Sequence, residues 1–225
     1  TGRSVVFYPL PKLTGREVGL MKNDEMDTKG HILEIARSEF AASGYYATSM
    51  DSIVKATGLS KGALYWHFRS KAELFRAVLS EEAEMVKKII FPEKEDLKEQ
   101  DLQQFFLERG ERLIDFYHSG REYVLLWLHI SLEAQRENTE VTHMAIEIKD
   151  SVTNELLVRL ADLEPPVERL DNGLDGKEFI LLFEAILNGL LLDLQFKRNP
   201  ELTRKFWKFL VMRLLSQEED HFETA

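Results

Sequence analysis

The segment TSMDSIVKATGLSKGALYWHFRSK, residues 48–71, constrains the fold most, because it holds the start and stop signals of two short helices and the start of a third. Thr48 or Ser49 can cap the first helix, and Thr48 with Asp51 has the spacing of a capping box. Gly58 can end that helix in the left-handed conformation that glycine tolerates. The segment therefore predicts a helix–turn–helix unit.

A second short helix is expected over residues 61–68, followed by a long helix whose start carries the capping-box pair Ser70 and Glu73. The major groove of duplex DNA admits one α-helix, and a short polar helix suits it. The alternative is a packing unit in which Tyr65, Trp66 and Phe68 are core residues, since helix–turn–helix pairs are common. The predicted DNA contacts are Thr48, Ser49, Ser60, Lys61, Gly62, Ala63, Tyr65, Trp66, His67 and Lys71.

Two sequence blocks extend this unit: FAASGYYATSMDSIV at 40–54 and TGLSKGALYWHFRSKAELF at 57–75. Together they resemble the DNA-binding domain of the TetR family of transcriptional regulators. The resemblance covers about residues 28–79 and is nearly gapless. It implies an all-α fold, in which an N-terminal three-helix helix-turn-helix domain precedes a larger C-terminal helical domain for ligand binding and dimerisation. It also implies a cytoplasmic bacterial regulator that is not an enzyme.

Charge is distributed unevenly over the three expected regions. Residues 28–76, the expected DNA-binding domain, hold seven Lys/Arg and four Asp/Glu, whereas the whole chain carries a net charge of −10. The expected ligand-binding and dimerisation domain, residues 77–225, is therefore strongly acidic. A basic head on an acidic body orients a protein towards phosphates, although an acidic soluble protein without that function is the simpler interpretation.

Residues 1–27 show no helical period and are interpreted as a flexible leader, either trimmed or vector-derived, with Met21 and Met26 as candidate natural starts. Their apolar run is too short for a secretory signal. The alternative is a basic arm that reaches along DNA through Arg3, Lys12, Arg16 and Lys22.

Apolar periodicity and helix breakers predict the remaining helices. Gly44 should end a helix over 28–43, and Pro92 should end the long helix that begins at Lys71. The segment 123–130 is apolar all round and should be buried centrally. The further helices are expected at about 97–118, 121–138, 139–163, 177–198 and 201–217.

The last two expected helices are more apolar than one face of a monomer requires. They form either the central core or a surface covered by another subunit. The TetR resemblance implies the second, a homodimer joined by a four-helix bundle that reads two half-sites of a partly palindromic double-stranded DNA operator. The candidate dimerisation residues are Phe179, Ala185, Gly189, Leu192, Phe206, Phe209 and Leu210.

The second domain is interpreted as a sensor with a mostly apolar pocket between helices. Asn188 is the sharpest candidate, because an amide among leucines must find a partner if it is buried. Each candidate is alternatively an ordinary core residue. The candidate ligand contacts are Phe105, Phe116, Trp127, His129, Phe183 and Asn188.

Signals for catalysis, metals and membranes are weak. The chain has no cysteine, no Gly-rich phosphate loop and no H-E-x-x-H motif, so we expect no cofactor and no enzymatic activity. His129 with Glu133 has the spacing of two metal ligands, as does His143 with Glu147, but a third ligand is missing, which favours salt bridges or caps. Paired acids such as Glu81-Glu82 are interpreted as solvated faces. The sequence contains no run of 18 apolar residues, so no membrane span is expected.

The hypothesis from sequence is a ligand-responsive homodimeric repressor that a small, largely apolar molecule releases from its operator. The long helix from Lys71 to Ile90 would shift when the ligand binds, so that the two DNA-binding heads no longer match the half-sites. The alternative is a helical protein-interaction module whose helix-turn-helix head does not bind DNA.

Overall fold

The computed structural model describes residues 23–91, 101–133, 139–161, 173–197 and 199–215, and these form nine α-helices. The fold is all-α, as the sequence predicted. The first four helices are α1 (Asn23–Ala47), α2 (Met50–Thr57), α3 (Lys61–His67) and α4 (Lys71–Ile90). The others are α5 (Leu102–Ser119), α6 (Arg121–Glu133), α7 (Glu140–Leu160), α8 (Gly176–Lys197) and α9 (Pro200–Leu214).

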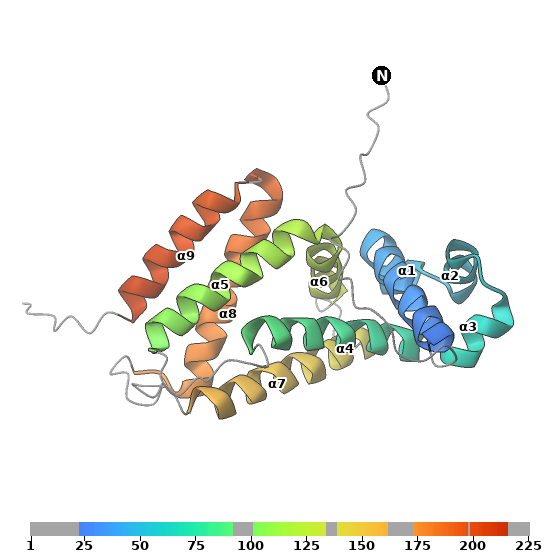
Figure 1. Cartoon of the computed structure of the whole chain (residues 1–225), viewed down its shortest axis with the longest axis horizontal. Helices are drawn as coiled ribbons and strands as arrows, with labels where there is room; N and C mark the ends of the chain where they lie inside the picture. Colours follow the sequence, from blue (N-terminus) through green and yellow to red (C-terminus); the bar gives the residue numbers. More distant parts are fainter. Residues whose placement is uncertain (1–22, 92–100, 134–138, 162–172, 198, 216–225) are drawn as a thin grey trace, which may run out of the picture.

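The helices form a small head and a larger body (Figure 1). The head consists of α1, α2 and α3, at one end of the molecule, and the body consists of α5 to α9. Helix α4 runs from the head along the body, with α7 beside it over part of its length (Figure 1). One helix therefore belongs to the packing of both parts.

Local capping differs from the prediction at two helix starts. The reciprocal capping box of α2 joins Ser49 and Ser52, not Thr48 and Asp51. At α4, the Ser70 hydroxyl accepts from the backbone N–H of Glu73, but the Glu73 carboxylate accepts from the N–H of Arg69, one residue before the cap. Each start is nevertheless satisfied by side-chain oxygens, as helix N-termini require.

Two glycines lie at the ends of helical segments in the left-handed region. Gly58 has φ 70° and ends α2, as predicted. Gly44 has φ 76° and interrupts the helical geometry of α1, where the sequence placed a helix end. A Cβ at Gly44 would lie 3.1 Å from Nδ1 of His129, so the site favours glycine both for its backbone conformation and for the close approach of α6.

Two hydrophobic cores hold the molecule together. The first joins the head to α4, α6 and α7, and its largest fully buried side chains include Phe40 and Phe75, whose rings meet edge to face at 4.9 Å. The second joins α5, α8 and α9 to the end of α4. Helix α4 contributes to both cores, so a shift of this helix affects the packing of the head and of the body.

Helix α5 approaches α9 closely at Gly110. The indole N–H of Trp207 donates to the carbonyl of Phe106 at 3.0 Å, and a Cβ on Gly110 would lie 2.0 Å from the indole ring. Trp207 itself is 2 % exposed. The glycine therefore makes room for the largest side chain of the second core.

Several predicted helix ends lie outside the described residues. These are the breaker at Pro92 and the ends expected at 138, 163 and 217. The predicted leader also lies outside the described residues as far as residue 22, and α1 begins at Asn23. Thr139 caps α7 as predicted. Of the segment 123–130, Tyr123, Val124, Leu126 and Ile130 are buried and the rest are half-buried.

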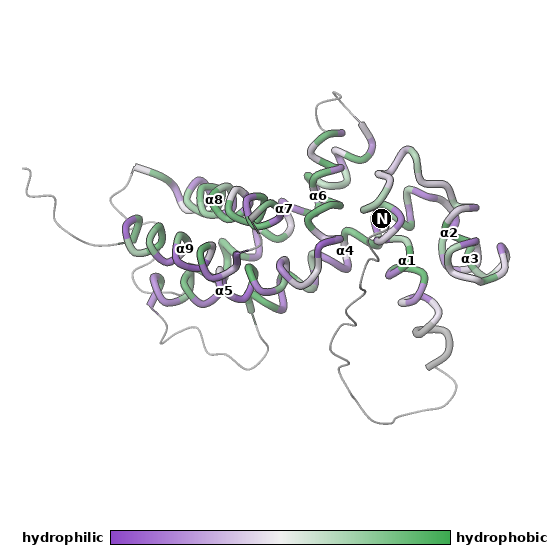
Figure 2. Tube along the Cα trace, turned by 90° about the horizontal axis from the view of Figure 1, so that it is seen from above, coloured by the Kyte–Doolittle hydropathy of each residue, from purple (hydrophilic) through white to green (hydrophobic). Residues whose placement is uncertain are grey.

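Helix α8 bears on the prediction that the chain has no membrane span. Its segment Gly176–Phe196 has a mean hydropathy of 1.7 and is long and apolar enough to cross a membrane by length and composition. Figure 2 shows hydrophobic residues along much of this helix. The count of uninterrupted apolar residues missed it because Glu184, Asn188 and Asp193 break the run. Core helices of soluble proteins pass the same test, so the finding is weak evidence for a membrane.

Candidate DNA-binding surface and ligand cavity

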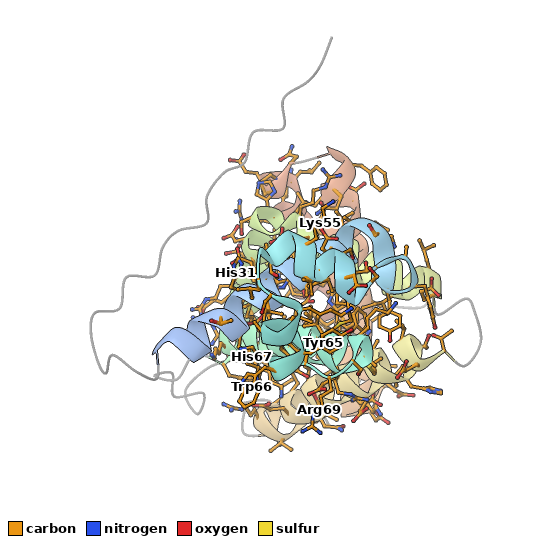
Figure 3. All side chains as sticks on the ribbon, turned by 90° about the vertical axis from the view of Figure 1, so that its right-hand side faces the viewer. His31, Lys55, Tyr65, Trp66, His67 and Arg69 are labelled. Carbon is orange, nitrogen blue, oxygen red and sulfur yellow. The ribbon has the colours of Figure 1, made fainter. Side chains whose placement is uncertain are left out.

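Helix α3 lies at the far end of the head with its polar face outward (Figure 3). Leu64 and Phe68 are buried and anchor it on the first core. Trp66 is 77 % exposed and Tyr65 is 37 % exposed, so these two aromatics are not core residues. Buried apolar side chains therefore hold this short helix on the head, and its opposite face is exposed at the end of the molecule.

Basic side chains surround this helix. Lys61 is exposed and pairs with Asp51 of α2 at 2.8 Å, and this partner raises the pKa of its ammonium group. His31, Lys55 and Arg69 lie on the same end of the molecule (Figure 3). The sequence analysis did not include these three among the site residues, although their basic character was the available signal. Exposed ion pairs are weak, so phosphate can compete for Lys61.

Some predicted DNA contacts hold the head together instead of facing outward. Thr48 is buried and its hydroxyl donates to the carbonyl of Gly44 at 2.8 Å. The Lys71 ammonium donates to the carbonyls of Tyr45 and Thr48 at 2.8 and 2.9 Å, and burial lowers its pKa. Both residues therefore support the turn between α1 and α2. The Ser60 hydroxyl caps α3 by accepting from the backbone N–H of Ala63.

The other predicted contacts are more accessible. Ser49, Lys61 and Gly62 are exposed like the two aromatics, and Ala63 and His67 are half-buried. Their contacts with DNA stay predictions, since the structure contains the protein alone.

Two polar contacts join the head to α4 and α7. Arg37 of α1, 5 % exposed, pairs with Glu81 of α4. The Tyr45 hydroxyl donates to Glu140 of α7 at 3.3 Å, and burial together with this carboxylate raises the pKa of Tyr45 to about 12. Both contacts involve α1, so the position of the head depends on both α4 and α7.

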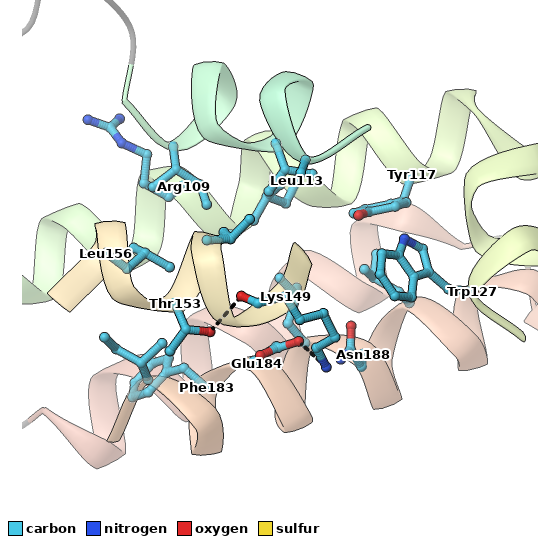
Figure 4. Close-up of a pocket in the computed structure, with 18 of the residues that line it drawn as sticks. Arg109, Leu113, Tyr117, Trp127, Lys149, Thr153, Leu156, Phe183, Glu184 and Asn188 are labelled. Atoms are coloured by element: carbon cyan, nitrogen blue, oxygen red, sulfur yellow. Dashed lines mark hydrogen bonds and ion pairs between the residues drawn. The ribbon is translucent and has the colours of Figure 1, made fainter. Parts of the chain in front are cut away.

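A cavity of about 440 Å³ lies within the body, between α4, α5, α6, α7 and α8, with Trp207 of α9 also in its wall. Four of the six candidate ligand contacts line it: Phe105, Trp127, Phe183 and Asn188. Figure 4 shows the last three of these in the cavity wall. Its wall is largely apolar and aromatic, which is typical of small-molecule sites. The sequence analysis missed several further lining residues: Glu82, Phe106, Arg109, Tyr117, Lys149, Thr153, Glu184 and Trp207.

The structure does not bring the other two candidates to this cavity. Phe116 packs against Tyr123 in a tilted ring contact with centroids 4.6 Å apart, and His129 lies against Gly44 at the junction with the head. Asn188 lines the cavity but is exposed, which corrects the premise that its amide is buried.

Glu82 is the polar residue of the cavity that most contradicts the sequence analysis. It was interpreted as part of a solvated face, but it is 1 % exposed. Its Oε1 accepts from the Trp127 indole N–H at 2.5 Å and from the Tyr117 hydroxyl at 3.5 Å. Burial raises the pKa of its carboxyl to about 8, against the opposing effects of Trp127, Arg37 and Tyr117. Its spacing of three and four residues from buried Leu79 and Val78 was the signal that placed it on the apolar face.

The candidate dimerisation residues fall into two groups. Phe179 is 1 % exposed and belongs to the second core of the subunit. Leu210 is half-buried, whereas Ala185, Gly189 and Leu192 of α8 and Phe206 and Phe209 of α9 are exposed. The structure contains one chain, so their role in dimerisation stays a prediction.

The structure contains no group of three or more His, Asp or Glu suited to a metal ion within the residues it describes. Glu147, one of the spaced candidates, pairs with Arg76 at 2.7 Å and joins α4 to α7. This is the salt-bridge role that the sequence analysis favoured for such residues.

The fold and the exposed short helix define a helical protein with an N-terminal helix-turn-helix domain. Residues 32–78 match the family model described as bacterial regulatory proteins, tetR family. The HTH-type transcriptional regulator AcrR from Shigella flexneri is 40 % identical over 57 residues, which is 25 % of this chain and 26 % of that relative. The chain thus spans about a quarter of the length of the first curated relatives that it matches.

Solved structures extend the likeness over the body. GusR from Salmonella enterica is 25 % identical, covers 86 % of this chain and 97 % of its own, and has a TM-score of 0.70. FadR from Bacillus subtilis, solved with stearoyl-CoA, is 16 % identical, covers 83 % and 97 %, and has a TM-score of 0.66, which shows the fold alone. Residues 32–78 are therefore similar to the DNA-binding domain of TetR-family proteins, and the curated relatives that match there are transcriptional regulators.

Proposed function

We propose that the chain is a homodimeric repressor that binds a partly palindromic DNA operator and leaves it when a small molecule enters the body. The observation that carries this proposal is the exposed face of α3, with Lys61, Tyr65 and Trp66 outward and Leu64 beneath. Each α3 would enter one of two successive major grooves, as recognition helices of this class do.

An uncovered apolar surface supports the dimer. Large apolar side chains are exposed along α8 and α9, and single subunits seldom leave so many on two neighbouring helices without a partner. A two-fold contact there would place the two heads at a fixed spacing. The exposed apolar residues of this surface are Leu181, Leu192, Phe196, Phe206, Phe209 and Met212.

The packing of α4 and α6 supports the response to a ligand. Both helices line the cavity, and both contribute buried residues to the core that holds the head. A molecule that fits one position of these helices better than another shifts the balance between head positions, by no more than its difference in affinity. FadR in its complex with stearoyl-CoA is a protein of this fold that was solved with a small molecule.

A cytoplasmic location in a bacterium agrees with this function, because the operator is there. The family resemblance supports it, and the apolar surface of α8 is assigned to the dimer and not to a membrane.

The test is fluorescence anisotropy of labelled duplex DNA with three variants across a salt series. Lys61→Ala should weaken binding to all duplexes and reduce the slope of log affinity against log salt by about 2, since a dimer loses two phosphate contacts. Trp66→Ala should lower affinity on the preferred duplex. Lys88→Ala, an exposed cation of α4 away from α3, should change neither value.

The competing function is a helical protein-interaction module. It predicts that the wild type shows no salt-dependent duplex binding and that Lys61→Ala behaves like Lys88→Ala. Either result would remove the support that the exposed face of α3 gives to the repressor.

A further inference from the structure

The cavity contains one buried carboxyl group whose hydrogen bonding is incomplete. Both hydrogen bonds to Glu82 end on Oε1, from Trp127 and Tyr117, and Oε2 has no hydrogen-bond partner among the described residues. The residue is 1 % exposed and lines the cavity. A buried polar atom without a partner is costly, so the site favours a group that can approach Oε2.

The other charged groups of the cavity already have ion-pair partners. Lys149 of α7 pairs with Glu184 of α8 at 2.6 Å. Arg109 of α5 pairs with Glu108 at 3.3 Å, and it lies towards the end of the cavity opposite Tyr117 and Trp127 (Figure 4). Glu82 has no ion pair within the part of the chain that the structure describes, which makes it the carboxyl with capacity for a further cation.

The charges around Glu82 outside the cavity nearly balance. Arg37 of α1 favours its ionised form, whereas Glu122 of α6 opposes ionisation. Tyr117 of α5 and Trp127 of α6 donate to it and also favour the ionised form. Burial outweighs these effects and raises the pKa to about 8, so at neutral pH the carboxyl is mostly protonated.

Aromatic rings line much of the cavity that this carboxyl group borders. Phe105, Phe106, Phe183, Trp127 and Trp207 all line the cavity. Aromatic faces attract organic cations and also bury apolar surface. Carboxyl and rings together therefore match a molecule that is hydrophobic and positively charged at one end.

We propose that the effector is an amphipathic organic cation, whose ammonium group pairs with Glu82 while its apolar part lies against the aromatic wall. This inference rests on the proposed function and specifies its ligand. In the binding step, the O–H bond of the Glu82 carboxylic acid breaks and its proton goes to solvent. The carboxylate that remains pairs with the ammonium group, so the net charge of the site is unchanged.

The same contact reaches the head. Arg37 lies over the Tyr123 ring at 4.8 Å and pairs with Glu81, the residue beside Glu82. When the cation binds, Glu82 loses its proton, so a negative charge forms on the carboxylate, which interacts with the Arg37 guanidinium, together with the positive charge of the ligand. This redistribution of charge lies beside the Arg37–Glu81 contact between α1 and α4, which links the ligand site to the head.

The test uses the full chain without DNA and two probes of one shape. The probes are phenylhexyltrimethylammonium and its neutral analogue, in which carbon replaces the nitrogen. Binding is followed by tryptophan fluorescence from pH 6 to 9, and by calorimetry in buffers of different ionisation enthalpy. We expect affinity for the cation to rise about tenfold per pH unit up to about pH 8, with about one proton released at pH 6.

Two acid-to-amide variants complete the design. Glu82→Gln should lower affinity for the cation at least tenfold at pH 8.5 and abolish its pH dependence. Glu84→Gln, an exposed acid on the same helix, is the matched control and should retain both. The proton count of the wild type requires no variant, so it remains informative if Glu82→Gln fails to fold.

Three results would overturn the proposal: equal affinity for the neutral analogue, binding of the cation without proton release at pH 6, or no binding of the cation at any pH. None of them bears on whether the protein binds DNA, because DNA is absent. A failure of DNA binding in the anisotropy test would, in turn, leave the cation results intact.

Discussion

Glu82 is an acid at a core position, and its burial should appear in the stability of the whole protein. The pKa of the folded protein, about 8, lies above the ordinary carboxyl value of 4.5. Between these values the folded state binds more protons than the unfolded state, so the free energy of unfolding falls as pH rises through this window and levels off above it. The contribution of this residue approaches 1.4 kcal/mol per pH unit.

Chemical denaturation at pH 5, 7 and 9 checks this. Glu82→Gln removes the titrating group, so we expect the variant to gain stability relative to the wild type by about 1 kcal/mol or more from pH 5 to pH 9. Glu84→Gln supplies the baseline for an exposed acid of α4. A difference between wild type and Glu82→Gln that stays constant with pH would contradict the burial of an ionisable carboxyl here.

Residues whose role is local could be predicted, and those whose role depends on packing could not. Gly58 and Ser60 act within their own turn, so spacing in the sequence identified them. Lys71 was predicted to contact phosphate, but its ammonium group reaches two carbonyls from residues more than twenty positions earlier. Asn188 was predicted to be buried in an apolar run, yet it is exposed while lining the cavity, and the sequence does not show which side of α8 is covered.

At the scale of elements, the contact between α5 and α9 depends on the absence of a side chain at Gly110. The built Cβ lies 2.0 Å from the Trp207 indole, whose N–H donates to Phe106 at 3.0 Å. We expect Gly110→Ala to lower the free energy of unfolding by about 2–4 kcal/mol, because either the indole or α5 must move in a close-packed core.

A second glycine provides the comparison. Gly30 is in α1 with nothing within 4 Å of a built Cβ, so Gly30→Ala should raise stability by about 0.5–1 kcal/mol through helix propensity. Thermal or denaturant unfolding of both variants measures the difference. An equal free energy of unfolding for Gly110→Ala and Gly30→Ala would contradict the close contact of α5 with α9.

The helices themselves were largely predictable, because apolar periodicity and capping residues act over one or two turns. For example, the predicted starts of α7 after Thr139 and of α9 near Pro200 agree with the structure. The cavity was only partly predictable. Phe105, Trp127 and Phe183 were suggested by residue type, but a space between five helices depends on how far apart they pack. That distance is set by tertiary contacts that one sequence does not reveal.

At the scale of the whole molecule, the exposed apolar surface of α8 and α9 predicts the assembly. Phe209 is 63 % exposed, and Phe206 is also exposed. We expect Phe209→Glu to convert the dimer to a monomer at micromolar concentration, because a charge buried in an apolar contact is left without a partner. Light scattering after size exclusion gives the mass directly.

The control is Val158→Glu, which places the same charge on an exposed apolar position of α7 outside the proposed contact. It should leave the mass of the dimer unchanged. A monomeric wild type, or a dimer that tolerates Phe209→Glu, would contradict the contact through α8 and α9. The monomer should also bind DNA far more weakly, since one short helix reads few bases.

The central claim is that the head binds duplex DNA and recognises its sequence. The most direct measurement is fluorescence anisotropy of the wild-type protein, across a salt series, with DNA from upstream of its own gene and with random duplexes of equal length. We expect tight binding that prefers the upstream DNA and weakens steeply with salt. Absence of binding to any duplex at low salt would contradict it.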